Sequence, residues 1–171
     1  CIRDRYISYL LTPATVCLAV PLYEQLELLK KNKVAVVCGI LSGTLASLTG
    51  IFVLCMLFGF NHQQYVTMLP KSITTAIGIG ISEELGGIVT ITVAVIIITG
   101  ILGNVIADTV FHIFKIKNPL AKGLALGTAS HAIGTARAIE MGPVEGAMSS
   151  LAVAVAGLLT VVFVSGFAQL I

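Results

Sequence analysis

The chain contains 171 residues, of which 57% are hydrophobic and 11% are charged, and its formal net charge is +2. Because soluble domains carry about 25% charged residues, this composition, with a mean hydropathy of +1.03, excludes an ordinary soluble domain and predicts a polytopic membrane protein. The charge is too small and too dispersed along the chain for a nucleic-acid partner.

The first apolar segment, residues 9–25, is interrupted. It contains Pro13 and Pro21, and a proline removes a helix hydrogen bond and clashes with the preceding turn. The segment is therefore predicted to be broken, and its hydroxyl residues Thr12 and Thr15 are candidates for a binding site. The chain also begins at Cys1 without a methionine, from which we expect an N-terminal part to be missing.

Three longer segments are nearly free of charge and long enough to cross a bilayer. They lie near 34–59, 87–111 and 145–169, and each covers the roughly 20 residues that a crossing helix needs. Glycine and β-branched residues inside them are compatible with membrane helices. The sequence therefore predicts an all-α fold with three full crossings, in a single transmembrane domain over residues 1–171.

A second short apolar segment, residues 68–84, is entered through Pro70. A shift of 59 residues aligns it with segment 9–25 and places "VAVV" (34–37) on "VAVI" (93–96), which indicates a weak internal repeat. Paired short segments interrupted by glycine or proline are typical of transporter binding sites. The alternative is two kinked helices that only pack, but polar groups at membrane depth favour a cavity. These groups are Lys71, Ser72, Thr74 and Thr75.

Lysines mark the predicted cytoplasmic loops. One group, Lys30 to Lys33, precedes the first crossing, and another, Lys115 to Lys122, follows the second. The positive-inside rule places both groups in the cytoplasm, which a re-entrant segment at 68–84 satisfies. Each repeat then holds one crossing and one re-entrant element, so the second copy is inverted. If both broken segments cross fully, the repeats are parallel and one basic loop lies outside.

Polar residues gather in "GTASHAIGTARAIE", residues 127–140, between two apolar runs. On a continuous helix, residues three and four apart line one stripe, which must face protein or water rather than lipid. We expect this stripe, together with Thr135, to converge with the broken segments on one polar pocket. The stripe consists of Gly127, Ser130, His131, Gly134, Arg137 and Ala138.

Arg137 has two interpretations, which the sequence leaves open. Glu140 lies three residues further along the chain and could form a structural ion pair with Arg137 within the helix. Alternatively, the planar guanidinium of Arg137 receives the carboxylate of a substrate, while His131 titrates or donates a hydrogen bond.

The chain resembles the LrgB/CidB family over essentially its whole length. The similar segments are "LLTPATVCLAVPLYEQL" (10–26), "LPKSITTAIGIGIS" (69–82), "IITGILGNVIAD" (97–108) and residues 121–160. The most specific motif is Ser-His-x-x-Gly-Thr-x-Arg at 130–137. Two positions depart from the family pattern: Ala76 stands where proline is expected, and Ala132 stands where glycine follows the histidine.

The resemblance implies two functions. Bacterial members are regarded as antiholin-like regulators of murein hydrolase export and cell lysis, which act with a small holin-like membrane protein of the LrgA/CidA type. Other members move small carboxylates such as pyruvate and glycolate. The resemblance also implies N-terminal hydrophobic segments beyond those of this chain.

An enzymatic role is not expected. Ser130 and His131 are adjacent, so on a helix they would point about 100° apart and could not readily form a nucleophile–base pair. The three histidines, at 62, 112 and 131, lack the spacing of metal ligands. No metal or other cofactor is predicted.

The leading prediction is a multi-pass transporter of small monocarboxylates, of the pyruvate or glycolate type, in the bacterial inner membrane. Antiholin-like control of cell lysis is the alternative. The expected partners are the substrate, the lipid bilayer and the holin-like protein, and a homo-oligomer is compatible with the sequence. The predicted substrate-binding residues are Thr12, Thr15, Lys71, Ser72, Thr74, Thr75, Ser130, His131, Thr135 and Arg137, with Glu140 as a structural ion-pair residue.

Overall fold

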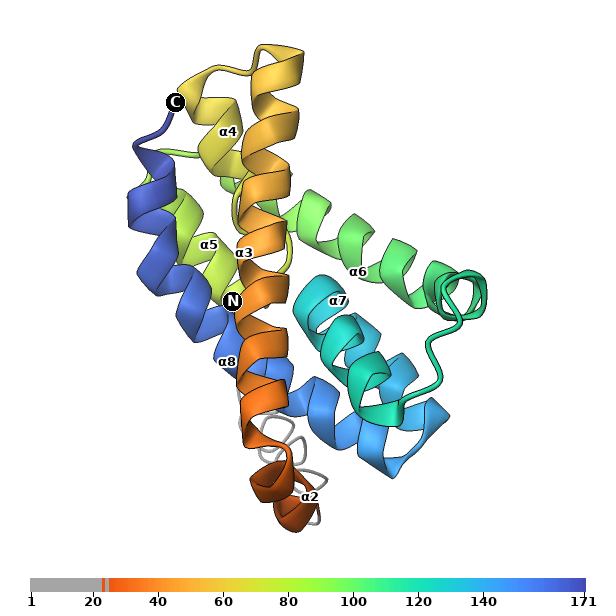
Figure 1. Cartoon of the computed structure of the whole chain (residues 1–171). Coiled ribbons are helices and arrows are strands. Elements are labelled where there is room, and N and C mark those ends of the chain that lie inside the picture. Colours follow the sequence, from red (N-terminus) through yellow and green to blue (C-terminus); the bar gives the residue numbers. More distant parts are fainter. Residues whose placement is uncertain (1–22, 24) are drawn as a thin grey trace, which may run out of the picture.

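The protein is helical throughout the part that the structure describes. The computed structural model describes Tyr23 and residues 25–171, and no strand occurs among them. The predicted all-α fold is confirmed. In chain order the helices are α2 (Leu26–Lys31), α3 (Lys33–Phe58), α4 (His62–Met68), α5 (Thr75–Glu84), α6 (Val89–Ile113), α7 (Pro119–Met141) and α8 (Pro143–Ala168) (Figure 1).

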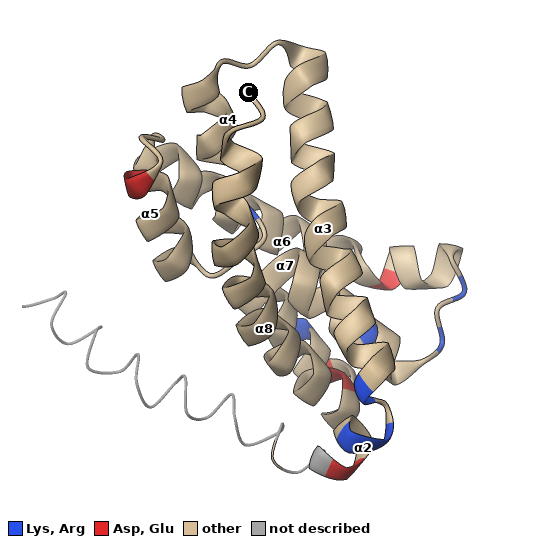
Figure 2. Ribbon diagram, turned by 60° about the vertical axis from the view of Figure 1, so that its left-hand side comes forward, with Lys and Arg blue, Asp and Glu red and all other residues tan. Residues whose placement is uncertain are grey.

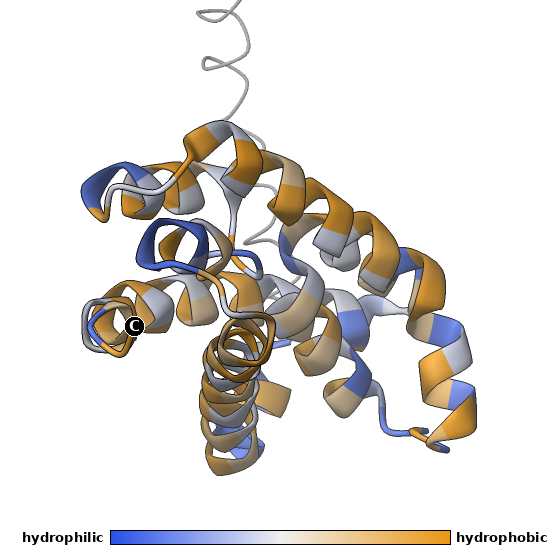
Figure 3. Ribbon diagram, turned by 90° about the horizontal axis from the view of Figure 1, so that it is seen from above, coloured by the Kyte–Doolittle hydropathy of each residue, from blue (hydrophilic) through white to orange (hydrophobic). Residues whose placement is uncertain are grey.

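Three of these helices are long and apolar enough to cross a membrane. They are α3, α6 and α8, with 26, 25 and 26 residues, and their bounds match the predicted crossings to within two residues. Their outward faces carry exposed apolar side chains such as Leu57, Val105 and Leu158. Figure 3 shows apolar residues, in orange, along much of the length of these helices. The three predicted segments are confirmed as helices that are long and apolar enough to cross a membrane.

Local sequence signals set several helix ends. Gly59 closes α3 in a left-handed conformation (φ 65°), which glycine adopts without steric cost. Asn61 then begins α4 through a capping box, in which its side chain accepts a hydrogen bond from the backbone N–H of Gln64. At the start of α7, the Asn118 side chain caps the helix, and Pro119 supplies its first residue.

The segment between α3 and α6 forms a helical hairpin, named here the α4–α5 hairpin (residues 62–84). Helix α4 ends, residues 69–74 turn back, and α5 begins. Pro70 lies in this turn and lacks the N–H that would continue a helix. At the far end of α5, Ser82 is hydrogen-bonded to Thr92 of α6 at 2.8 Å, so α5 leads back to the start of α6. The interruption predicted for this segment is present.

Helix α7 is also folded back on itself, and we name it the α7 hairpin (residues 119–141). His131 has a left-handed backbone (φ 43°, ψ −136°) that interrupts the helix. A Cβ added at Gly134 would lie only 2.8 Å from the carbonyl oxygen of Leu126, eight residues earlier. In a straight helix, residues eight apart are separated by about 12 Å. The two halves therefore lie side by side.

Both halves of the α7 hairpin pack on α8. In the first half, a Cβ added at Gly127 would lie 2.5 Å from the carbonyl oxygen of Ser149. In the second half, the Thr135 hydroxyl is hydrogen-bonded to the Ser149 hydroxyl at 2.8 Å. The single polar stripe predicted across residues 127–140 is therefore wrong, because the chain reverses at His131 and the following residues run back along the hairpin.

Apolar packing holds each hairpin between α3 and α8. One buried cluster joins α3, the α4–α5 hairpin and α8, and it includes Leu48, Tyr65, Ile81 and Val164. A second cluster joins α3, the α7 hairpin and α8, and it includes Ile40, Leu124 and Met148. The two crossings thus form a shared wall for both hairpins.

The described chain alternates crossings and hairpins, in the order α3, α4–α5 hairpin, α6, α7 hairpin, α8. Because a hairpin returns to the side from which it came, this order predicts that the lysines of α2 and those of the α6–α7 connection lie toward the same end of the bundle. In Figure 2, α2 lies at the bottom and the α6–α7 connection lies at the right, about halfway up. The predicted 59-residue repeat begins in segment 9–25, of which only Tyr23 and Gln25 belong to the described residues.

Candidate functional site

The tips of the two hairpins meet near the middle of α3 and α8. Ser72, at the tip of the α4–α5 hairpin, and Thr128, near the tip of the α7 hairpin, line one small cavity of about 10 Å³. Thr44 and Ser47 of α3 and Thr160 of α8 complete its polar lining. The cavity is roughly large enough for one water molecule. Two chain reversals therefore face each other inside the crossing bundle.

Lys71 brings a positive charge to this meeting point. Its ammonium donates to Ser72 Oγ at 2.7 Å and to Ser47 Oγ at 3.4 Å, and the Ser47 hydroxyl donates to Ser72 Oγ at 3.0 Å. Among the described residues, no carboxylate forms an ion pair with Lys71. An ammonium has three donors, so one N–H remains for a ligand. A positive charge at membrane depth without a counterion favours an anionic ligand.

A larger hollow, named here the α3–α7 hollow, leads to Lys71 from the start of α7. Its volume is about 780 Å³, within the range of roughly 300–1,000 Å³ that is usual for ligand sites. Asn118 lies at one end, and Lys71 and Ser72 lie at the other. Leu120 and Leu124 of α7 also line the hollow, but most of its walls are small residues, which include Gly39, Ser42, Gly43 and Ala46 from α3 and Ala121, Ala125 and Ala129 from α7.

Ser130, His131 and Thr135 hold the tip of the α7 hairpin in place. The His131 Nε2 atom lies 2.9 Å from the carbonyl oxygen of Ile96 on α6. The Thr135 hydroxyl donates a hydrogen bond to the His131 carbonyl at 3.0 Å and is also hydrogen-bonded to the Ser149 hydroxyl of α8. Ser130 is buried against α6. None of the three lines the α3–α7 hollow, but the Lys71 ammonium lies close enough to the His131 ring to interact with it electrostatically.

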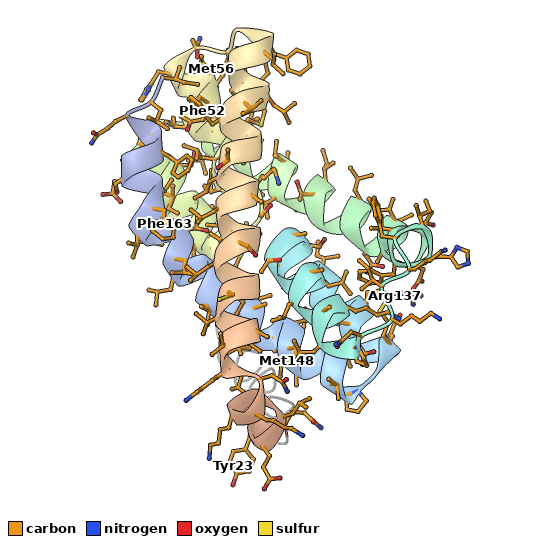
Figure 4. All side chains as sticks on the ribbon, in the orientation of Figure 1. Tyr23, Phe52, Met56, Arg137, Met148 and Phe163 are labelled. Carbon is orange, nitrogen blue, oxygen red and sulfur yellow. The ribbon has the colours of Figure 1, made fainter. Side chains whose placement is uncertain are left out.

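Arg137 lies away from the tips, near the open end of the α7 hairpin (Figure 4). Its side chain is 33% exposed and forms ion pairs with Asp108 of α6 and, at 2.6 Å, with Glu140. The hydrogen bond to Asp108, followed by that to Glu140, raises the pKa of the Arg137 guanidinium above its ordinary value. Two carboxylates of the chain itself therefore occupy Arg137, which does not line the α3–α7 hollow.

The other predicted site residues fall in two places. Thr74 and Thr75 form the start of α5, are half-buried, and do not line the α3–α7 hollow. Thr12 and Thr15 lie outside the described residues. The hydroxyl residues that sequence reasoning missed are Thr44, Ser47, Thr128 and Thr160. Thr44 and Ser47 left a signal, since they are three residues apart and so share one face of an apolar helix.

Three helices long and apolar enough to cross a membrane, two helical hairpins between them and a polar hollow at the hairpin tips define a multi-pass integral membrane protein. The sequence matches the model of the LrgB-like family over residues 3–170. This chain belongs to the LrgB family, and it is a multi-pass protein of a bacterial membrane.

Relatives of known name support this assignment. They include proteins named antiholin-like protein LrgB from Bacillus cereus (strains B4264 and Q1) and from Bacillus anthracis (strain A0248). Each is 42% identical over 163 residues, which cover 95% of this chain and 71% of the relative. No solved structure matches the chain.

Proposed function

We propose that this LrgB-family protein is antiholin-like and modulates cell lysis from within the membrane, together with a small holin-like membrane protein of the LrgA/CidA type. The observation that supports this role is 42% identity, over 95% of the chain, to relatives named antiholin-like protein LrgB. Sequence patterns favoured carboxylate transport, but the names of the relatives support lysis control better. No catalytic role is proposed.

Autolysis in cells that lack the chromosomal copy tests this proposal. Complementation with the full-length protein, with and without its holin-like partner, is expected to slow lysis and to lower murein hydrolase activity in the medium. A Gly127→Leu variant serves as a loss-of-packing control, because its side chain would collide with α8. Unchanged lysis in a complemented strain whose membranes contain the protein would overturn the antiholin-like role.

Lys71 and Ser72, with the α3–α7 hollow that leads to them, are named here the hairpin site. This site supports a second candidate function, which is transport of a small monocarboxylate. Lys71 has an N–H available for a ligand, and the Ser72 hydroxyl accepts two hydrogen bonds but can still donate one. A carboxylate of the pyruvate or glycolate type can accept from both groups, and hydrogen bonds between charged groups are the strong ones. Through the α3–α7 hollow, this ligand can reach Lys71 from the Asn118 end, next to the basic α6–α7 connection.

Helix ends add to the attraction of an anion. α5 begins directly after the tip of the α4–α5 hairpin, and the second half of the α7 hairpin begins directly after His131. Thr74, at the N-cap of α5, makes no side-chain capping hydrogen bond. The first N–H groups of a helix favour negative charge, and interrupted helices with this orientation form the substrate sites of transporters.

Uptake of radiolabelled pyruvate into proteoliposomes tests the second candidate. Lys71→Met is expected to lower the apparent affinity by about tenfold to a hundredfold, because a hydrogen bond to a charged group contributes about 1.5–3 kcal/mol. Lys33→Met removes the same charge outside the α3–α7 hollow and should leave uptake unchanged. Wild-type uptake equal to that of protein-free liposomes would exclude transport, and normal uptake by Lys71→Met would remove Lys71 from the site.

A further inference from the structure

A second hollow, named here the loop hollow, lies at the end of α6 and on the α6–α7 connection. Its volume is about 570 Å³, which is again within the range of roughly 300–1,000 Å³ for ligand sites. None of its residues lines the α3–α7 hollow. Its charged and aromatic lining comprises Asp108, Phe111, His112, Lys115, Lys117 and Lys122.

The loop hollow carries an excess of positive charge. Three lysines line it, and its one carboxylate, Asp108, is in an ion pair with Arg137. Within the described part of the chain, none of these lysines forms an ion pair. The Lys122 ammonium instead lies 5.7 Å from the centre of the Phe111 ring, where the ring attracts a cation without neutralising it. Several unpaired ammonium groups that line one hollow suit a phosphate.

The position of the loop hollow indicates where this phosphate comes from. The hollow lies at the C-terminal end of α6, one of the three membrane-crossing helices. Ile113 and Phe114, next to it, are 65% and 71% exposed. Further into the crossing, Leu102 and Val105 continue this exposed apolar surface. A basic hollow thus adjoins an apolar strip, as an amphiphilic ligand requires.

We propose that the loop hollow binds the phosphate of an anionic phospholipid, whose acyl chains lie along the exposed apolar face of α6. Basic pockets at the cytoplasmic side of membrane proteins bind such head groups, and the positive-inside rule makes this end of the bundle cytoplasmic. Lys115 and Lys117 belong to the α6–α7 connection, whereas Lys122 belongs to the α7 hairpin. A bound head group therefore ties the hairpin to α6.

Lipid titration of the purified full-length protein tests the proposal. The protein in mild detergent receives phosphatidylcholine, phosphatidylglycerol or cardiolipin, and retained lipid is measured by native mass spectrometry alongside the unfolding temperature. We expect the anionic lipids to be retained and to raise the unfolding temperature, and phosphatidylcholine to do neither. The triple variant Lys115→Gln, Lys117→Gln, Lys122→Gln should lose affinity on the order of tenfold or more.

The matched control removes the same charge from α2 and the start of α3, through Lys30→Gln, Lys31→Gln and Lys33→Gln. These lysines lie outside the loop hollow, so affinity should stay close to that of the wild type. Equal losses in the two triple variants would overturn the proposal in favour of diffuse surface charge. Equal retention of phosphatidylcholine would overturn it, and so would displacement of the lipid by millimolar inorganic phosphate.

A charge-retaining variant separates binding from folding. Lys115→Arg, Lys117→Arg and Lys122→Arg together keep three positive charges and should keep the preference for anionic lipid. If the glutamine variant is not recovered as a folded protein, Lys117→Gln alone replaces it. Loss of the lipid preference in the folded arginine variant, or its full retention in Lys117→Gln, would count against the loop hollow.

Discussion

Replacement of Gly127 by alanine tests whether the α7 hairpin lies as close to α8 as the structure describes. The added Cβ would lie 2.5 Å from the carbonyl oxygen of Ser149 and 2.6 Å from the Cβ of Ala152. Ordinary van der Waals contact begins at 3.4 Å, so the hairpin and α8 must move apart by about 0.9 Å. Backbone and Cβ atoms form this contact, and no flexible side chain can turn away to relieve it.

Two opposing contributions set the size of the stability change caused by Gly127→Ala. Overpacking of a close interface costs about 1–3 kcal/mol, whereas alanine in place of a helical glycine stabilises by about 0.5–1 kcal/mol. We therefore expect a net destabilisation on the order of 1–2 kcal/mol. For a protein of this size, each kcal/mol shifts the unfolding temperature by about 2–4 °C, so the expected decrease is about 2–8 °C.

The assay is thermal unfolding of the purified protein in detergent, with Gly50→Ala as the matched control. Gly50 also lies inside a membrane-crossing helix, but nothing lies within 4 Å of a Cβ added there. This control should unfold at or above the wild-type temperature. Equal unfolding temperatures for Gly127→Ala and Gly50→Ala would refute the reasoning that the hairpin is in backbone contact with α8.

Three further changes test charge, topology and the hairpin site. Arg137→Gln should lower the unfolding temperature in low salt, and the difference should vanish in about 1 M salt, where the screening length is about 3 Å; a persistent difference would identify packing as the cause. In a background without other cysteines, Lys31→Cys and Lys117→Cys should react with an impermeant thiol reagent only in inverted vesicles, and labelling of intact cells at 117 would contradict a shared cytoplasmic end. Ser72→Ala should weaken monocarboxylate uptake by about two- to tenfold, whereas Ser165→Ala, at an exposed position on α8, should not; equal effects would exclude a role for the Ser72 hydroxyl.

The crossings could be predicted from the sequence because a bilayer imposes a simple requirement, which is roughly 20 apolar residues in succession. The α4–α5 hairpin also left a local signal, since Pro70 cannot continue a helix. The α7 hairpin left none: His131 lies in a run without proline, where helical periodicity predicts one continuous stripe. Its reversal goes together with contacts to α6 and α8, including the bond from Thr135 to Ser149, which local sequence does not contain.

The candidate site also contains some residues that could be predicted from the sequence and others that could not. Lys71 and Ser72 could be predicted, because polar groups in a short interrupted membrane segment are costly and point to a cavity. Their neighbour Thr128 could not be predicted, since α7 approaches the α4–α5 hairpin only in three dimensions. The spacing of Thr44 and Ser47 indicated a polar face on α3, but not which segment packs against it. Asp108 was missed for the same reason, because it lies 29 residues before the arginine that it binds.

The α7 hairpin also bears on how the protein is synthesised. Its most extensive contacts are with α8, which leaves the ribosome after it. Until α8 is present, Thr135 lacks its Ser149 partner, and the glycine face around Gly127 has no helix to cover it. Close packing of small residues drives the association of membrane helices, so the hairpin reaches its final position only once the last helix has been inserted. A nascent chain that ends before Pro143 therefore lacks α8 and also lacks the surface that positions the α7 hairpin.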